Sequence, residues 1–278
     1  MIGIVRSSDE DIRRKKMEFW SRTGAAVEYE QAIKSKNSIN QIKNLVELEI
    51  VLKNVKGFIL DAGTGTGRFA IPLACNPENV VVALDYSNEM LDLNRKLSAQ
   101  QGINTIEYVQ GDIEHLKYPA DYFDAIVSIT VVRHFPQWQN ILKEYARVLK
   151  PRGKLVFEMC SGDHIVLANR ISPRFGLRFK KDGFYNFEAE VPFDNLHTWL
   201  DSIGIDIEDR LTYDFLNNNC FLKIVTINDL GYKIVRKAIG LILRLSPLKR
   251  LMVWMELKVL RYFPPSFSYN YMVIGQKR

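Results

Sequence analysis

Short apolar runs alternate with helical patterns through the middle of the chain. The apolar, β-type runs occupy 58–60, 80–84, 105–109, 123–129 and 154–159, and the helical patterns occupy 67–75, 87–101 and 137–149. Strands that are apolar on both faces and alternate with helices are typical of a parallel sheet covered on both sides. The middle of the chain is therefore predicted to form a doubly wound α/β sheet.

Both ends of the chain carry helical patterns as well. Residues 9 to 54 contain helix formers throughout, no proline, and apolar residues at roughly helical spacing. Residues 231 to 262 predict two amphipathic helices with a break at Ser246-Pro247, because proline disrupts a helix interior. The alternating sequence SFSYNYMVIG then predicts a last strand over about 268–275.

The region between these parts is less regular. Within 161–192, the sequence RFGLRFKKDGFYNFEAEV favours a hairpin that turns at 181–183. Asp194 is predicted to be the N-cap of a short helix that ends near residue 202. A strand over about 205–214 is expected to follow it.

Composition narrows the class of protein. A chain of 278 residues with 47% hydrophobic and 25% charged residues predicts an ordinary globular protein, with one large domain or one domain and an appendage. Its cysteines, Cys75, Cys160 and Cys220, are too few and too scattered for a disulfide framework or a zinc site. A reducing cytoplasm is the expected compartment. The charged N-terminal sequence has no apolar h-region, so we expect no secretory signal.

The net charge of +6 is unevenly distributed. Residues 233–278 contain ten Lys or Arg and one acid, Glu256, which gives +9 there and −3 in the remaining 232 residues. A basic segment of this kind can meet nucleic acid, anionic lipid or an acidic substrate, and its sign alone does not choose among them.

Three glycines at alternate positions, Gly63, Gly65 and Gly67, follow an apolar strand that ends in Asp61. Glycines let backbone amides approach a ligand closely, because no Cβ intervenes. A phosphate-binding P-loop would continue with Lys and Ser or Thr, and a dinucleotide-binding loop would place glycine or alanine where Arg68 stands. Arg68 thus excludes the P-loop and disfavours a dinucleotide.

This glycine loop and four segments after it resemble class I S-adenosylmethionine-dependent methyltransferases that act on small molecules. The matching segments are DAGTGTG, VVALDYSNEML, VQGDIEHL, FDAIVSITVVRHF and YARVLKPRGKLVFE, all within 58–160. The resemblance implies a Rossmann-like, seven-stranded, mostly parallel sheet whose last strand is antiparallel. We expect N-terminal helices over 1–54 that form a lid, a cofactor-binding core over 55–160, and a substrate-side region over 161–278 with a helical insertion at 231–262.

The resemblance also implies which residues hold S-adenosylmethionine. The glycine loop would wrap its methionine portion, an acid after the second strand would bind the ribose, and the third segment would hold the adenine. The implied cofactor-binding residues are Tyr29, Asp61, Gly63, Thr64, Gly65, Asp85, Tyr86, Met90, Asp112, Ile113 and Ser128. Tyr29 would cover the cofactor with Trp20 behind it, while Asp112 and Ile113 would meet the amino group and the ring of adenine.

The position and chemistry of Asp85 support its role in ribose binding independently of the resemblance. It follows an apolar strand, 24 residues beyond Asp61, and a carboxylate can accept hydrogen bonds from two ribose hydroxyls at once. Other assignments have simple alternatives. Asp61 could cap nearby amides, and Met90 and Ile113 could be ordinary core residues.

Methyl transfer from a sulfonium is an in-line displacement, so the protein mainly has to align the acceptor and exclude water. An oxygen or carbon acceptor can need a base as well, and His134 after the fourth strand is the candidate, although it could simply pack beside the cofactor. Arg133, Glu158 and His164 are further candidates at neighbouring strand ends. No group of acids has metal-ligand spacing, so no metal is expected.

The expected acceptor is a small organic or lipid-like molecule. The sequence has neither the Asn/Asp-Pro-Pro-aromatic signature of nucleobase amino methylation nor the Pro-Cys pair of cytosine C5 methylation. The basic helices at 231–262 could cap the acceptor pocket or contact an anionic membrane surface from its periphery. Two other functions stay open: an RNA methyltransferase that binds phosphates through these helices, and a non-catalytic cofactor-binding protein of the same fold.

Overall fold

A computed structural model describes residues 8–34, 38–175, 188–215 and 229–278. Its centre is an eight-stranded sheet in which seven strands follow the order β3-β2-β1-β4-β5-β8-β7 and β6 pairs with β5. The strands are β1 Phe58–Ala62, β2 Val80–Asp85, β3 Glu107–Gln110, β4 Phe123–Ser128, β5 Leu149–Ser161, β6 Glu190–Val191, β7 Ile205–Tyr213 and β8 Asn270–Lys277.

The sheet confirms the predicted Rossmann-like fold. All strand pairs are parallel except β5–β8 and β7–β8, so β8 is the antiparallel strand that was predicted last in the chain. The described residues form one strand more than expected, because the two-residue β6 pairs with the end of β5. Ile59 and Leu60 of β1 point to opposite faces and are both fully buried, as expected for a sheet covered on both sides.

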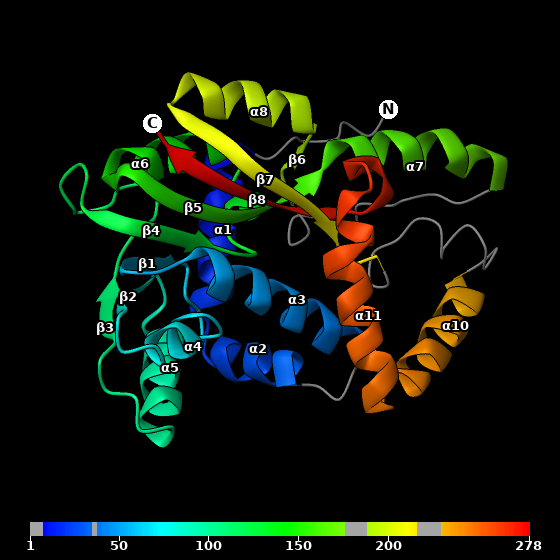
Figure 1. The fold of residues 1–278 in the computed structure, drawn as a ribbon, viewed down its shortest axis with the longest axis horizontal. Helices are drawn as coiled ribbons and strands as arrows, with labels where there is room; N and C mark the ends of the chain where they lie inside the picture. Colours follow the sequence, from blue (N-terminus) through cyan, green and yellow to red (C-terminus); the bar gives the residue numbers. More distant parts are fainter. Residues whose placement is uncertain (1–7, 35–37, 176–187, 216–228) are drawn as a thin grey trace.

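Helices cover both faces of the sheet (Figure 1). They are α1 Asp9–Ser21, α2 Ala25–Lys34, α3 Ser38–Asn54, α4 Ala70–Ala74, α5 Asn88–Gln100, α6 Trp138–Val148, α7 Gly162–Phe175, α8 Phe193–Ser202, α10 Asp229–Ile242 and α11 Ser246–Lys258, with the 3₁₀ turns η1 Val132–His134, η3 Leu260–Tyr262 and η4 Pro265–Phe267. One apolar core joins α6 and α8 to the sheet, and a second joins α3, α4 and α11 to its other face. In α6, the buried Trp138, Ile141, Leu142 and Tyr145 recur at the spacing of one helix face.

The segment after β5 differs from its prediction. Residues 162–175 were expected to be irregular, but they form α7. The Ser161 hydroxyl accepts a hydrogen bond from the His164 amide at 3.0 Å, which satisfies a free amide of the first turn as an N-cap does. The predicted hairpin turn at 181–183 lies outside the described residues.

The next helix, α8, starts slightly earlier than predicted. Phe193 is its first residue and Pro192 precedes it, so Asp194 lies in the first turn rather than at the N-cap. A carboxylate in the first turn still favours the helix through the helix dipole.

The two predicted basic helices are confirmed as α10 and α11. Pro247 lies in the first turn of α11, where its missing amide costs no helical hydrogen bond. Both helices contact α3. Figure 1 shows α11 beside the end of α3. Within the described ranges, no helix is long and apolar enough to span a membrane.

Candidate functional site

The loop after β1 has a backbone that requires its glycines. Gly63, Gly65 and Gly67 have φ angles of +77°, +54° and +89°, a region that residues with a Cβ rarely adopt. A Cβ on Gly63 would lie 2.5 Å from Val131, and one on Gly67 would overlap the Asn94 side chain. The loop can therefore pass close to its neighbours only because these side chains are absent.

Asp61 and Thr64 support this loop from inside. Asp61 Oδ2 accepts hydrogen bonds from the Thr64 hydroxyl at 2.6 Å and from the Ala70 amide at 3.0 Å. Burial raises the pKa of Asp61 to about 6, although these hydrogen bonds oppose the increase. Neither side chain lines the cavity described below. The two residues support the loop, and their direct contact with a cofactor stays a prediction.

Asp85 connects the end of β2 to the glycine loop. Its Oδ2 accepts a hydrogen bond from the Gly65 amide at 2.8 Å, and its Oδ1 accepts one from the Ser87 amide at 2.9 Å. Burial raises the pKa of Asp85, and the amide hydrogen bonds oppose that increase. Each oxygen has a further lone pair, so the carboxylate can accept additional hydrogen bonds from a ligand.

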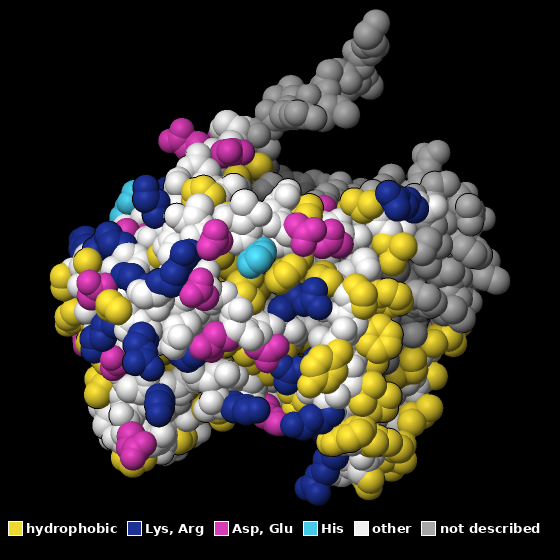
Figure 2. Space-filling view, turned by 45° about the horizontal axis from the view of Figure 1, so that its top comes forward, with side chains coloured by type: hydrophobic (Ala, Val, Ile, Leu, Met, Phe, Trp, Pro, Cys, Tyr) yellow, Lys and Arg dark blue, Asp and Glu magenta, His cyan; other side chains and the backbone are white. Residues whose placement is uncertain are grey.

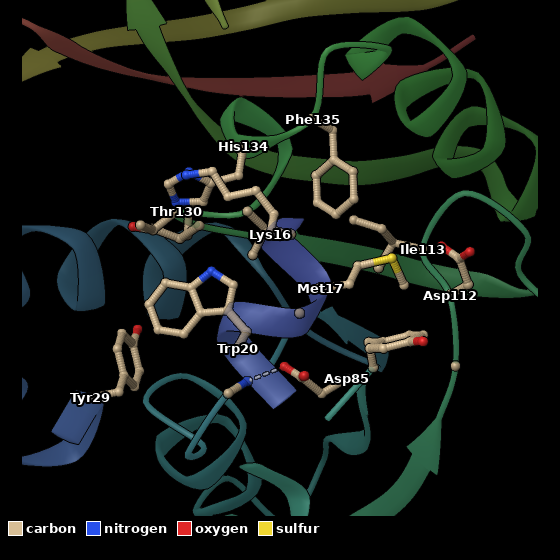
Figure 3. A pocket seen from close by; sticks show the side chains of 16 residues that line it. Lys16, Met17, Trp20, Tyr29, Asp85, Asp112, Ile113, Thr130, His134 and Phe135 are labelled. Carbon is tan, nitrogen blue, oxygen red and sulfur yellow. Dashed lines mark hydrogen bonds between the residues drawn. The ribbon is translucent and has the colours of Figure 1, made fainter. Parts of the chain in front are cut away.

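A cavity lies at the carboxyl ends of β1 to β4, beneath α1 and α2 (Figure 3). The carboxyl edge of an open α/β sheet is where such folds bind ligands. Its lining residues are Lys16, Met17, Trp20, Tyr29, Gly63, Gly65, Asp85, Tyr86, Gly111, Asp112, Ile113, Ile129, Thr130, Val131, His134 and Phe135.

Most of the predicted site residues meet in this cavity. Those that line it are Trp20, Tyr29, Gly63, Gly65, Asp85, Tyr86, Asp112, Ile113 and His134. Met90 and Ser128 do not line it. Met90 packs against α2, and the Ser128 hydroxyl lies 3.1 Å from the Ala62 carbonyl and 3.0 Å from the Tyr145 hydroxyl. Both residues belong to the core behind the cavity.

The cavity has two chemically different ends. Figure 3 shows Asp85, Asp112 and Ile113 on one side, which we call the Asp85 end. His134 and Thr130 lie on the other side, which we call the His134 end, and Trp20 projects between the two. Trp20 also meets Tyr29 edge to face, with ring centroids 5.7 Å apart, so two aromatic rings cover the middle of the cavity.

At the Asp85 end, Arg13 of α1 pairs with Asp112 and with Glu114. Asp112 Oδ1 also accepts a hydrogen bond from the Glu114 amide at 3.0 Å. These contacts connect α1 to the loop after β3 and hold the Asp112 carboxylate at the cavity wall.

Several lining residues were not predicted. Lys16 and Met17 come from α1, and Thr130, Val131 and Phe135 come from the segment after β4. The α1 sequence DEDIRRKKMEFWS is so rich in charge that it resembles a solvated surface helix. Its apolar Met17 and Trp20, three residues apart and so on one helix face, are the signal that could have indicated a covered cavity.

Lys16 and His134 are neighbours in the cavity wall. Lys16 Nζ lies 3.4 Å from His134 Nδ1. Lys16 is only 6% exposed, and burial, followed by the nearby Arg133 charge, lowers the pKa of its amine, while Glu188 opposes the decrease. A buried amine with a lowered pKa next to an imidazole is an arrangement that can accept or hold a proton.

The other three candidate catalytic residues make buried polar contacts outside the cavity. Arg133 is buried and pairs with Glu158 at 3.4 Å and with Glu188 at 2.7 Å. Glu158 also pairs with Lys43 at 3.2 Å. Burial by itself would raise the pKa of this carboxyl, but the charges of Lys43 and Arg133 outweigh it and hold that pKa well below its ordinary value. His164 Nδ1 lies 3.0 Å from the Ser266 carbonyl. None of the three lines the cavity.

Arg68 and the helices within 231–262 both lie away from the cavity lining. Arg68 turns away from the glycine loop and pairs with Glu47 of α3, with Asn44 Oδ1 2.8 Å away. No residue of 231–262 lines the cavity, so the prediction that these helices cap it does not hold for the described residues. Helix α1 takes that place. The described residues also contain no group of His, Cys, Asp and Glu that could hold a metal ion.

Known sequences match the same part of the chain. Residues 60–157 match the family described as "Methyltransferase domain". The Lactobacillus johnsonii protein named demethylmenaquinone methyltransferase is 40% identical over 101 residues, which cover 35% of this chain and 41% of that protein. The Coxiella burnetii protein named ubiquinone biosynthesis O-methyltransferase is 28% identical over 173 residues, which cover 62% of this chain and 72% of that protein.

A solved structure matches the fold over nearly the full chain. It is the Thermotoga maritima protein described as an S-adenosylmethionine-dependent methyltransferase and possible histamine N-methyltransferase, with a TM-score of 0.57 and 17% identity. The match covers 95% of this chain and all of that chain. The matched domain at residues 60–157 and this shared fold make the chain similar to S-adenosylmethionine-dependent methyltransferases.

Proposed function

We propose that the protein transfers a methyl group from S-adenosylmethionine to a small organic or lipid-like acceptor. The observation that carries this proposal is that one cavity has two different ends. Its Asp85 end suits a nucleoside, and its His134 end carries the basic side chains of Lys16 and His134. An enzyme that joins two substrates needs both kinds of surface in one water-excluding space.

The residues of the Asp85 end fit the cofactor. Asp85 keeps lone pairs for two ribose hydroxyls, and Ile113 and Met17 offer apolar surface to an adenine ring. Gly65 presents its backbone to the cavity without a side chain. A Cβ at this position would contact the Tyr29 ring at 3.4 Å and so would occupy space between the loop and that ring. We assign cofactor binding to Tyr29, Gly63, Gly65, Asp85, Tyr86, Asp112 and Ile113, with Asp61, Thr64, Met90 and Ser128 supporting them from behind.

The protein's own contribution to the reaction is alignment, exclusion of water and control of one proton. When bound, S-adenosylmethionine supplies an electrophilic methyl group on a sulfonium. Trp20 and Tyr29 cover the space between the two ends. His134 accepts the proton of an acceptor hydroxyl or acidic carbon, and Lys16 beside it favours negative charge on the acceptor.

The His134 end favours an apolar acceptor with one polar group. The segment after β4 also adds Ile129, Val131 and Phe135 to the cavity wall as apolar surface. The Thr130 hydroxyl donates to Glu158 at 2.9 Å and can still accept a hydrogen bond. The names of the two sequence relatives, which refer to menaquinone and ubiquinone, favour the same class. We therefore propose a reduced quinone or a similar lipid-like ring as the acceptor, in a cytoplasmic setting.

The experiment that tests this function measures transfer of a labelled methyl group. The full chain is incubated with methyl-tritiated S-adenosylmethionine and a naphthoquinol with a short isoprenoid tail, a catechol or histamine, and the extracted acceptor is counted. Label in the naphthoquinol, incorporated about 100-fold more slowly with His134→Ala, is the expected result. Binding of the cofactor with no label in any acceptor would contradict the proposed acceptor class and favour the non-catalytic alternative.

A further inference from the structure

Large apolar side chains are exposed along α10, α11 and the turn after them. Eleven of the eighteen exposed in the described part of the chain lie within 234–263: Ile234, Val235, Leu241, Ile242, Leu245, Leu248, Leu251, Trp254, Val259, Tyr262 and Phe263. Leu241 is 62% exposed and Tyr262 is 73% exposed. Such a concentration is unusual for a protein surface and is typical of interaction sites.

The apolar surface continues onto α3. Leu45 and Leu52 of that helix are 44% and 45% exposed. They line a groove between α3 and α11 together with Trp254 of α11. Figure 2 shows apolar side chains gathered on the right-hand side of the molecule, with Lys and Arg side chains beside them. The surface formed by α10, α11 and this edge of α3 is called the α10–α11 surface below.

Basic side chains are interspersed in the α10–α11 surface. Lys237, Arg244, Arg250 and Lys258 are exposed. Glu256 is the only acid within 233–278. Its side chain turns inward and is 1% exposed, and its Oε1 accepts a hydrogen bond from the Phe215 amide at 3.1 Å. The exposed face is therefore both apolar and positively charged.

We propose that the α10–α11 surface binds an anionic lipid bilayer. Amphipathic helices with Lys and Arg beside exposed Leu, Ile and Trp lie in the plane of a membrane interface, where apolar side chains enter the acyl boundary and cations meet lipid phosphates. Trp254 and Tyr262 have the amphipathic rings that favour the headgroup level. Helices of 14 and 13 residues fit this placement, since they lie on the bilayer. The inference does not depend on methyl transfer.

Charge complementarity favours lipid over other partners. Single-stranded nucleic acid binds to basic grooves that carry stacking aromatic rings, whereas this surface is dominated by aliphatic side chains. An oligomer interface would be expected to have depleted charge at its centre, and here cations are interspersed among the exposed apolar residues.

The test is sedimentation of the full chain with vesicles in the absence of cofactor. Vesicles of phosphatidylcholine alone are compared with vesicles that contain 30% phosphatidylglycerol. We expect at least tenfold stronger binding to the anionic vesicles and a loss of that difference in 0.5 M salt. The variants Leu241→Ser/Leu245→Ser and Lys237→Glu/Arg244→Glu/Arg250→Glu should each weaken binding at least tenfold.

Two matched controls separate the surface from general effects. Val27→Ser/Val80→Ser removes two exposed apolar side chains elsewhere, and Lys96→Glu/Lys117→Glu/Lys143→Glu makes the same charge change away from the surface. Both should bind vesicles within twofold of the native chain. Equal binding to the two vesicle types, no binding, or equal losses in the controls would overturn the proposal. So would concentration-dependent dimerisation that Leu241→Ser/Leu245→Ser abolishes, because a second copy would then cover the surface.

Discussion

The amine of Lys16 and the imidazole of His134 lie 3.4 Å apart, although 118 residues separate them in the chain. Helix α1 brings the lysine over the cavity, and the 3₁₀ turn after β4 brings the histidine to its wall. The pair occupies the end of the cavity opposite Asp85, which is where we propose that the acceptor binds.

Replacing His134 tests its role as a base. His134→Ala should lower kcat about 100-fold, since a positioned base contributes that order of rate, and should leave the Kd for S-adenosylmethionine within twofold. Steady-state kinetics and calorimetry measure the two quantities. The matched control is His115→Ala, which removes an exposed imidazole outside the cavity. Unchanged kcat would end the general-base assignment.

Replacing Lys16 tests the coupling within the pair. A cation beside an imidazole opposes its protonation, so Lys16→Met should move the acidic limb of the pH–rate profile upward by about one pH unit. Lys96→Met, which removes an exposed charge from α5, should leave the profile unchanged. A profile that drops in height without moving would show that Lys16 acts only on binding or packing.

The glycine loop predicts a difference between two Gly→Ala substitutions. Gly67 and Gly102 both have positive φ, but a Cβ would overlap Asn94 at Gly67 and would meet nothing within 4 Å at Gly102. Gly67→Ala should therefore lower the free energy of unfolding by about 3 kcal/mol, and Gly102→Ala by about 1 kcal/mol. Urea denaturation measures both. Equal losses would show that backbone strain alone decides the cost.

Buried Glu256 predicts a pH-dependent stability. Burial, followed by the nearby Asp214 charge, raises the pKa of Glu256 from 4.5 to about 8. The folded protein therefore keeps the Glu256 carboxyl protonated up to about pH 8, whereas the unfolded chain loses that proton near pH 4.5. The contribution of this group to the free energy of unfolding is fully present below pH 4.5 and is lost as the pH rises to about 8. The Gln side chain of Glu256→Gln stays neutral at every pH. The free energy of unfolding of this variant should exceed that of the native chain by about 2 kcal/mol above pH 8 and should equal it near pH 4.5.

Urea denaturation across this pH range, with Glu107→Gln as a control at an exposed carboxylate, measures the Glu256 effect. A constant difference between Glu256→Gln and the native chain at all pH values would contradict the argument, because it would show that the carboxyl does not change its charge in that interval.

The sheet was predictable because burial on both faces leaves a strong local signal. The runs at 58–60 and 123–129 are almost wholly apolar, and the observed strands β1 and β4 coincide with them. Asp85 was predictable for a similar reason, since its place at the end of β2 decides where its carboxylate points. Asp61 lies one residue before the end of β1, and its side chain turns inward to Thr64 and Ala70, which spacing alone does not reveal.

The other parts depend on contacts between distant segments. Nothing near Lys16 indicates that Thr130 and His134 will adjoin it, because α1 reaches the cavity only once the sheet has formed. Helix α7 was missed although Ser161 caps its first turn and Asp163 lies within it. The position of α10 and α11 on α3 likewise follows from packing rather than from their own pattern.

The most direct test of the account is a calorimetric titration of the full chain with S-adenosylmethionine, S-adenosylhomocysteine and NAD. The account predicts micromolar binding of the first two and none of NAD. Asp85→Asn should weaken binding about 100-fold, since hydrogen bonds to a charged acceptor contribute about 1.5 to 3 kcal/mol each, while the exposed control Asp92→Asn should bind as the native chain does. Binding of NAD alone, or equal affinities of Asp85→Asn and the native chain, would contradict it.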